Sequence, residues 1–391
     1  MKKTWMLTSC EFASFALAVQ AGGISHAQTA DAPYVFAVLA PLSGDNAIYG
    51  TTLQHGTQLA ADQINAAGGI KGKRVELQFL DTQCQATQAA NAASKIVSDS
   101  SIFAVIGDVC SSATMAAIPV LYRAGITEVS GDSTSPKITD LIKNRHYTNF
   151  ARTIMTDTAE AGGMLKVARA LHKTRVAVLY GSDDFGQVIY ALQRSLLSSG
   201  DTSMTLVDAE TYTPSVNKDF APQLTRIAAA KPDIILLDGY YNDAGTAVSQ
   251  MARVGLSGIP LVASAGIDQN GFMQLGGQAT EGTYVLSYYN PDNTSPQNTR
   301  FVAAFRAKYS SDPNEQATYG YEIPFIFKQA IEGGATRETL AKVVKAQTFT
   351  GPSGTTRFDE NGDVTGKSGI VDIVKGGKLV FDPEMTKAVN E

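Results

Sequence analysis

Short apolar runs alternate with longer stretches of helical periodicity along most of the chain. In residues 53–66, for example, apolar side chains recur at helical spacing, and Gly68 and Gly69 follow as a helix stop. The short runs are largely apolar rather than alternating, which predicts strands buried on both faces. The strand-like segments are 35–39, 75–80, 102–106, 126–129, 176–180, 205–207, 234–237 and 260–263; the helix-like ones are 53–66, 87–97, 114–122, 159–171, 185–197, 220–230 and 244–254.

The order of these segments predicts the fold class. Strands buried on both faces belong to parallel sheets that are covered by helices. The alternation begins again after the segment NFARTIMTD (149–157), so we expect an α/β protein with two doubly wound parallel-sheet domains. Segments 299–309, 318–331 and 337–346 add helices, and 370–381 predicts a terminal hairpin.

The N-terminus predicts a secretory signal peptide over residues 1–27. Lys2 and Lys3 precede a mostly apolar stretch, 5–19, and residues 25–27 form a small-x-small cleavage pattern. Cys10 raises the alternative of a lipid anchor, although few apolar residues precede it. No later segment approaches the ~20 apolar residues of a membrane span, so we expect an exported, soluble mature protein.

Composition narrows the possible partners. Of the 391 residues, 44% are apolar and 18% are charged, as in ordinary globular proteins. The formal net charge is −5 and no basic run is present, so we expect no nucleic-acid partner.

Two cysteines, Cys84 and Cys110, remain after removal of the signal peptide. An even number in an oxidising compartment favours one disulfide, with two buried free thiols as the alternative. A catalytic Cys110 would need a free thiolate, which a disulfide excludes.

Enzyme motifs are nearly absent from the sequence. There is no Gly-x-Ser-x-Gly or Gly-x-Gly-x-x-Gly pattern, and residues 362–368 imitate a phosphate loop but are one residue short. His55, His146 and His172 lack metal-ligand spacing to one another. We therefore expect no catalytic residues, no metal and no cofactor.

Ser111 and Ser112 follow an apolar run and open a helix-like stretch. A helix start offers free N–H groups and a positive dipole end, so an anion cradle is our interpretation. A helix cap and a nucleophile are the alternatives, the latter without a visible base. A second hydroxyl cluster, 130–136, follows the next strand and would lie on the same rim of a parallel sheet.

Several segments resemble the periplasmic leucine/isoleucine/valine-binding proteins, the solute-binding components of ABC importers. They are APLSGDNAIYG (40–50), AADQINAAGGIKGKRVEL (60–77), VIGDVCSSAT (105–114) and STSPKIT (133–139), and the resemblance continues through DDFGQ, DIILLDGYYNDAG and FDENGD. It implies the type I periplasmic binding protein fold, in which three crossovers join two lobes that close on a small ligand. The implied lobes are 28–152 plus 285–363 and 153–284 plus 364–391.

The resemblance also implies a binding site and a disulfide. Ser111, with its neighbour Ser112, would hold a ligand carboxylate together with Thr134. Tyr49 would line the first-lobe side, and Phe185 and Tyr240 would cover the ligand from the second lobe. The family's disulfide corresponds to Cys84 with Cys110.

One position departs from the family pattern. Amino-acid binders usually have an acid for the ligand ammonium where this chain has Ala265. Asp132, in SGDSTSP, is the predicted substitute, because an unpaired acid beside a ligand carboxylate would repel it. A solvated loop acid or a helix cap is the alternative for Asp132, and Glu322 is a weaker candidate for the ammonium partner.

The sequence thus predicts a periplasmic solute-binding protein that delivers a small carboxylate-bearing ligand, preferably an amino acid, to the membrane subunits of an ABC importer. We expect a monomer without enzymatic activity. An amine-free carboxylate such as an aromatic acid, a sensory receptor on the same fold, and an enzyme of doubly wound fold are the alternatives.

Overall fold

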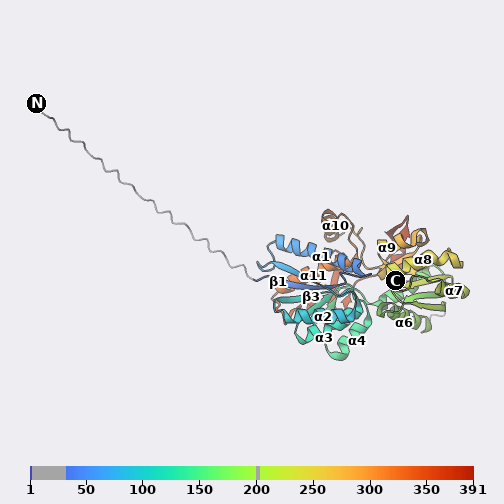
Figure 1. Cartoon of the computed structure of the whole chain (residues 1–391), viewed down its shortest axis with the longest axis horizontal. Helices are drawn as coiled ribbons and strands as arrows, with labels where there is room; N and C mark the ends of the chain where they lie inside the picture. The colour runs from blue at the N-terminus through green and yellow to red at the C-terminus, as the bar shows by residue number, and fades with distance from the viewer. Residues whose placement is uncertain (2–31, 200–202) are drawn as a thin grey trace. The chain divides into compact units, whose positions relative to one another are not determined.

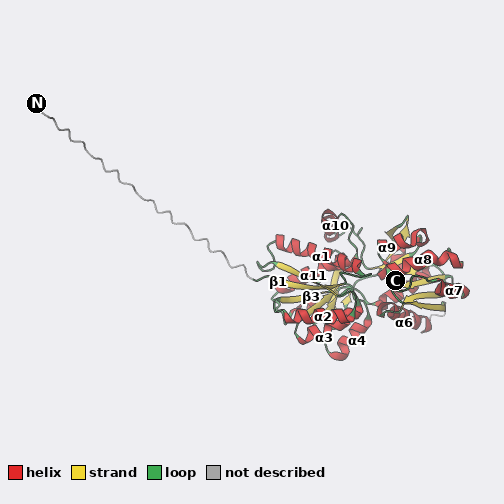
Figure 2. Cartoon of the chain, viewed as in Figure 1, coloured by secondary structure: helices red, strands yellow, loops and turns green. Residues whose placement is uncertain are grey.

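Two helix-covered β-sheets organise the chain in a computed structural model (Figures 1 and 2). The structure describes Met1 and residues 32–199 and 203–391. The predicted signal peptide, 1–27, lies outside the described residues apart from Met1. Among the described helices, none is long and apolar enough to cross a membrane.

The first sheet has five parallel strands in the order β2-β1-β3-β4-β5. The strands are β1 (Tyr34–Ala40), β2 (Val75–Asp81), β3 (Ile102–Ile106), β4 (Thr127–Ser130) and β5 (Phe150–Arg152). Its helices are α1 (Ala47–Ala66), α2 (Ala86–Ser98), α3 (Ser111–Arg123), α4 (Pro136–Arg145), α10 (Pro296–Tyr309), α11 (Glu315–Glu332) and α12 (Leu340–Ala346). This strand order is that of a doubly wound sheet, which places ligands at the carboxyl ends of the strands.

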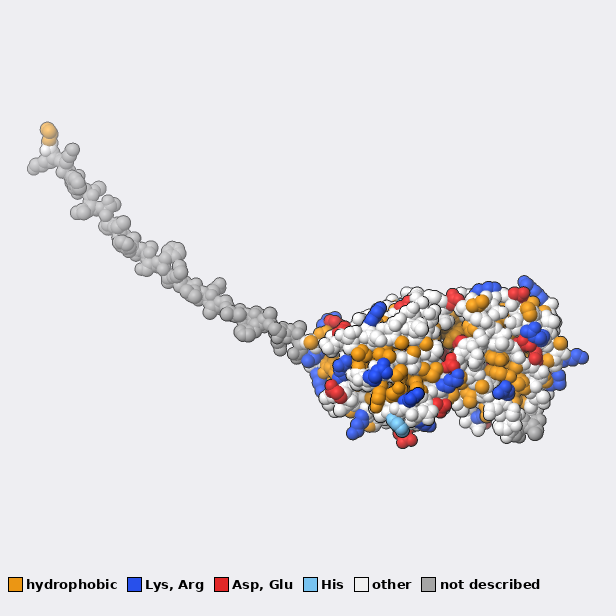
Figure 3. Space-filling view, turned by 60° about the horizontal axis from the view of Figure 1, so that its bottom comes forward, with side chains coloured by type: hydrophobic (Ala, Val, Ile, Leu, Met, Phe, Trp, Pro, Cys, Tyr) orange, Lys and Arg blue, Asp and Glu red, His pale blue; other side chains and the backbone are white. Residues whose placement is uncertain are grey.

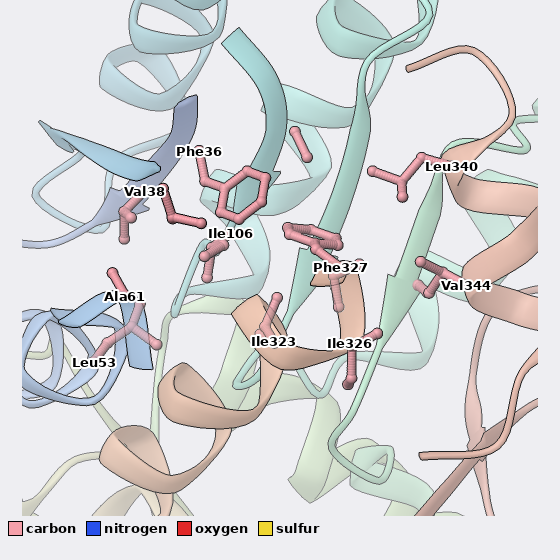
Figure 4. Packing of buried hydrophobic residues seen from close by; sticks show 14 of the residues in the cluster. Phe36, Val38, Leu53, Ala61, Ile106, Ile323, Ile326, Phe327, Leu340 and Val344 are labelled. Carbon is pink, nitrogen blue, oxygen red and sulfur yellow. The ribbon is translucent and has the colours of Figure 1, made fainter. Parts of the chain in front are cut away.

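Alternate residues of β1 face opposite layers of helices. Phe36 and Val38 pack with α1, α11 and α12, and Figure 4 shows Phe327 of α11 beside Phe36. Ala37 and Leu39 pack instead against α2 and α3. Because both faces of the sheet are covered, every position of β1 is apolar, which is the pattern that predicted this strand.

The second sheet repeats the same order with two added strands, β15-β14-β10-β9-β8-β6-β7. The strands are β6 (Arg175–Gly181), β7 (Thr205–Tyr212), β8 (Ile234–Asp238), β9 (Leu261–Ala263), β10 (Tyr284–Ser287), β14 (Ile370–Lys375) and β15 (Lys378–Phe381). The first five in sequence are parallel, whereas β14 and β15 form the predicted antiparallel hairpin. Its helices are α5 (Asp157–Ala170), α6 (Asp184–Ser198), α7 (Ala221–Ala229), α8 (Tyr241–Gln250), α9 (Asn270–Gly276) and α13 (Pro383–Asn390), with 3-10 turns at Met251–Val254, Ala265–Ile267 and Gly277–Thr280.

The chain passes between the two sheets three times: between β5 and α5, between β10 and α10, and before β14. A small antiparallel sheet of β11 (Phe349–Gly351), β12 (Gly354–Phe358) and β13 (Val364–Thr365) precedes the third passage. The predicted fold class, two doubly wound lobes joined by three crossovers, is confirmed.

Several elements were not predicted or have other bounds. β5 and β10 are too short for a periodic signal, and α4 is a polar helix that begins with the Ser135 cap and Pro136. β7 extends to Tyr212 because it is an edge strand, where Asp208 and Glu210 can remain half-buried. The expected lobe boundary at 284/285 falls inside β10, and that at 363/364 separates β13 from its partner β12.

The predicted disulfide between Cys84 and Cys110 is confirmed, rather than the alternative of free thiols. Its Cα atoms are 5.3 Å apart, and it joins the turn after β2 to the residue that precedes α3. The face shown in Figure 3 carries Lys and Arg side chains interspersed with Asp and Glu.

Candidate ligand-binding site

The carboxyl ends of strands from both sheets meet at a cavity of about 40 Å³. Loops after β3, β4 and β5 of the first sheet line it, as do loops after β6, β8, β9 and β10 of the second. Its lining residues are Tyr49, Val109, Ser111, Asp132, Thr134, Ile154, Glu160, Phe185, Tyr240, Ala265, Gly266, Tyr288, Glu315 and Gln316. This is the place where doubly wound sheets bind ligands.

All the predicted site residues except Ser112 lie in this lining. Ser112 is half-buried on α3, next to Ser111, and its side chain is not part of the cavity wall. Glu322 lies elsewhere as well: its carboxylate accepts hydrogen bonds from the backbone and hydroxyl of Ser353, and Lys367 is 3.9 Å away. Glu322 is therefore held by structural contacts and does not line the cavity.

Ser111 begins α3 and is buried. The N–H groups of Ser111 and Ser112 have no partner within the helix, because a helix leaves its first N–H groups free. The Ser111 hydroxyl oxygen accepts from the backbone N–H of Ser135 at 3.2 Å, which leaves its own proton available to donate. The geometry suits an anion, and no hydrogen bond joins Ser111 to a histidine or lysine in the part of the chain that the structure describes.

Buried hydroxyls hold the loops after β3 and β4 together. Ser130 and Ser133 donate to the carbonyl of Asp108 at 2.8 and 2.9 Å, and the hydroxyls of Ser133 and Thr114 are 2.7 Å apart. This network fixes the position of Thr134 relative to Ser111.

Aromatic side chains from both lobes close the cavity. The Tyr49 hydroxyl donates to the carbonyl of Gly266, in the turn that follows β9. Its ring centroid is 5.7 Å from that of Tyr240, which stacks on Phe185 at 5.5 Å. Tyr49 belongs to the first lobe and the other three residues to the second, so these contacts span the cleft.

Three carboxylates line the same cavity. Neither oxygen of Asp132 has a hydrogen-bond partner among the described residues, and neither does one oxygen of Glu315. The other oxygen of Glu315 accepts from Gln316 at 2.7 Å. Glu160 is better satisfied, accepting from the backbone N–H of Ala265 and, at 3.0 Å, from the hydroxyl of Tyr288.

Burial raises the pKa of each of these carboxyls. The pKa of Asp132 rises to about 7, and the amide of Gln316 opposes this only partly, because it lies near Asp132 but donates its hydrogen bond to Glu315. Burial likewise raises the pKa of Glu160 to about 7. The pKa of Glu315 lies well above its usual range because of burial and the negative charges of Asp268 and Asp132.

The contact between Glu160 and Ala265 bears on the one position where the sequence departs from the family pattern. Ala265 lines the cavity where an acid was expected, and Glu160 of α5 places its carboxylate against the Ala265 backbone. An acid is therefore present at this position, supplied by another element. Sequence reasoning missed Glu160 and Glu315 because acids in the first turn of a helix are ordinary partners of the helix dipole.

A model of the periplasmic binding protein family matches residues 33–378. The chain belongs to this family. The resemblance found in its motifs is thus confirmed over most of the sequence.

Curated relatives carry names of the same group. The leucine-, isoleucine-, valine-, threonine-, and alanine-binding protein of Pseudomonas aeruginosa is 28% identical over 93% of this chain and 95% of its own. The Leu/Ile/Val-binding protein of Escherichia coli is 27% identical over 84% and 88%.

Solved structures of family members share the fold. The leucine-binding protein LivK of Thermotoga maritima has a TM-score of 0.80 and 27% identity, over 89% of this chain and 97% of its own. A solute-binding protein of an ABC transporter from R. palustris, in complex with benzoate, has a TM-score of 0.79 at 20% identity, over 89% and 95%. At that identity the second structure supports the fold alone.

No cluster of three or more His, Cys, Asp or Glu side chains among the described residues could hold a metal ion. The carboxylates around the cavity are therefore not arranged as a metal site, and the periplasmic binding protein fold presents them to the cleft between its lobes.

Proposed function

We propose that this protein is the periplasmic solute-binding component of an ABC importer and captures a small carboxylate-bearing ligand, an amino acid, between its two lobes. It delivers the ligand to the membrane subunits of the importer, acts as a monomer and catalyses no reaction. The amino-acid names of the relatives from Pseudomonas and Escherichia support this ligand class.

The observation that carries the proposal is that one cavity holds both hydrogen-bond donors for a carboxylate and a carboxylate for an ammonium. Ser111, Thr134 and the first N–H groups of α3, including that of Ser112, offer donors for a carboxylate. Asp132 offers two unpartnered buried oxygens for an ammonium. Tyr49, Phe185 and Tyr240 would pack on the ligand from the two lobes.

Lobe closure is part of this function. Small-molecule sites usually enclose about 300–1,000 Å³, so a cavity of about 40 Å³ admits a ligand of amino-acid size only when the lobes move apart. We place the lobes at residues 32–152 plus 288–365 and 153–287 plus 366–391, which keeps β10 and β13 with their sheets. The crossovers between them would serve as the hinge.

An amine-free carboxylate is the second candidate ligand. The absence of an acidic side chain from position 265 itself, where this chain has Ala265, favours it. The carboxylates of Asp132, Glu160 and Glu315 argue against it, because an anion would meet like charges in a buried site.

Calorimetric titration with leucine and 4-methylpentanoate, which differ by the amine, tests the proposal. Wild type should prefer leucine. Asp132→Ala should lose leucine binding almost completely, because it leaves a buried ammonium unpaired at a cost of about 3–5 kcal/mol, and it should bind 4-methylpentanoate better. The exposed Asp140 provides a control, since Asp140→Ala should bind both as wild type does. Wild-type preference for the amine-free acid would replace the amino acid with the second candidate.

A further inference from the structure

We propose that the ligand carries a net positive charge, as an amino acid with a second protonated nitrogen. This inference rests on the proposed function and specifies the substrate class of the same cavity. It comes from the number and the hydrogen-bonding state of the carboxylates that line the cavity, Asp132, Glu160 and Glu315.

The charges in the cavity do not balance with a neutral amino acid. The ammonium of a zwitterion would neutralise one carboxylate, but its own carboxylate restores the negative charge. Asp268, which accepts a hydrogen bond from the hydroxyl of Ser287, is a fourth acid, and its charge helps to raise the pKa of Glu315. Buried carboxylates in such number are either protonated or paired with cations, so a ligand that brings a second cation can hold them in the ionised form.

The protein itself does not supply these cations. In the described ranges, no Lys or Arg forms an ion pair with Asp132, Glu160 or Glu315. Lys367, which is buried nearby over the ring of Tyr319, donates to the hydroxyl of Ser353 at 2.7 Å and faces Glu322. Arg152 is bound to Asp363 at 2.6 Å. Both cations are thus committed to other partners.

The unpartnered oxygens also specify the kind of cation. Asp132 has two such oxygens and Glu315 has one, and all three are buried acceptors. Buried acceptors are normally satisfied by donors, and a protonated amine brings three N–H groups whereas a quaternary ammonium brings none. The ligand nitrogens should therefore carry hydrogens.

The carboxylates come from two sides of the cleft, which suits two separate nitrogens. Asp132 follows β4 and Glu315 opens α11, both in the first lobe, while Glu160 belongs to α5 of the second lobe. Glu160 is held against Ala265, on the second-lobe side. With the α-ammonium paired to Asp132, as proposed above, Glu315 and Glu160 remain for the second nitrogen.

The experiment compares amino acids that differ only in the second charge. L-2,4-diaminobutyrate, L-ornithine and L-lysine are each titrated beside the isosteric L-norvaline, L-norleucine and L-2-aminoheptanoate. The best diamino acid should bind about 10- to 100-fold more tightly than its neutral isostere, as expected for a charge-assisted hydrogen bond. Binding should release protons, measured as a dependence of the heat on the ionisation enthalpy of the buffer.

Two variants on the same helix localise the effect. Glu315→Gln should remove most of the preference for the diamino acid, whereas Glu332→Gln, at the exposed end of α11, should keep it. Circular dichroism confirms that both are folded, and Glu160→Gln gives an independent second test should Glu315→Gln not fold.

The outcomes separate this inference from the proposed function. If a neutral amino acid binds as tightly as its diamino counterpart, the inference is overturned and the amino-acid function stands. If none of the diamino acids binds at millimolar concentration, the inference is likewise overturned. Binding of benzoate but of none of the amino acids would overturn the proposed function itself.

Discussion

The hydroxyl of Tyr49 donates a hydrogen bond to the backbone carbonyl of Gly266, a residue 217 positions away on the opposite lobe. The same hydroxyl lies 3.5 Å from the backbone nitrogen of Tyr241, so one side chain of α1 contacts two loops of the second sheet. This contact belongs to the closed arrangement of the lobes and would be lost on opening.

Tyr49→Phe should weaken ligand binding about two- to tenfold, because a neutral hydrogen bond contributes about 0.5–1.5 kcal/mol to the closed state. Calorimetry gives the affinity, and small-angle scattering with saturating ligand reports the closed fraction. Tyr122→Phe, on the exposed side of α3, is the matched control. Unchanged affinity and closure in Tyr49→Phe would show that the bond contributes nothing to closure.

Removal of the disulfide should destabilise the first lobe without changing the ligand preference. Cys84 and Cys110 are 26 residues apart in sequence, and a loop of that length corresponds to about 3–4 kcal/mol of unfolding free energy. The double substitution Cys84→Ser with Cys110→Ser, compared with wild type under oxidising and reducing conditions, isolates the bond. Equal denaturation midpoints for the variant and oxidised wild type would contradict the expectation.

The sequence predicted the parts of the site that follow strand ends. Ser111 and the hydroxyl cluster 130–136, which contains Thr134, each follow a buried apolar run, and parallel strands place such positions on one rim. Phe185, Tyr240 and the role of Asp132 were predicted only from the resemblance to the leucine/isoleucine/valine-binding proteins. Fold class followed from the period of the apolar runs, which is a local property of the chain.

Glu160, Tyr288 and Glu315 could not be predicted in this way. Glu160 lies in the first turn of α5, which follows the first crossover, and Glu315 lies in the first turn of α11, which follows α10 rather than a strand. Tyr288 directly follows β10, a strand too short to be recognised. Whether these side chains reach the cavity depends on how the helices dock across the sheets, which local periodicity does not encode.

Ser111→Ala should weaken ligand binding about 10- to 100-fold, since a hydrogen bond to a charged group contributes about 1.5–3 kcal/mol. Ser112→Ala is the control on the adjacent residue: it removes a hydroxyl outside the cavity wall and keeps the backbone N–H. Calorimetry on both variants with the preferred ligand gives the comparison. If the two variants bind equally well, the Ser111 hydroxyl does not hold the carboxylate.

The unliganded protein should lose stability as the pH rises from about 4 to about 7, and Asp132 should account for part of the loss. The pKa of Asp132 is raised from 3.8 to about 7 in the folded protein, so between these values the folded state binds more protons than the unfolded state. The surroundings of Asp132 explain why its pKa is raised rather than lowered. Asp132 faces Asp108 from the loop after β3 and Glu315, Gln316 and Tyr319 from α11, a set without a cation.

Asp132→Asn should therefore be more stable than wild type above about pH 7 and similar to it near pH 4, where the wild-type carboxyl is already protonated. The pKa of Glu160 is also raised to about 7, so the variant should still lose some stability as the pH rises. Thermal melting of ligand-free protein across this range, with Asp140→Asn as the exposed control, measures the difference. A cationic ligand should reverse the trend in wild type, because it pairs with the ionised carboxylate and so stabilises the folded state more at high pH than at low pH. If the melting temperatures of Asp132→Asn and wild type change equally with pH, the ionisation of Asp132 does not destabilise the folded protein.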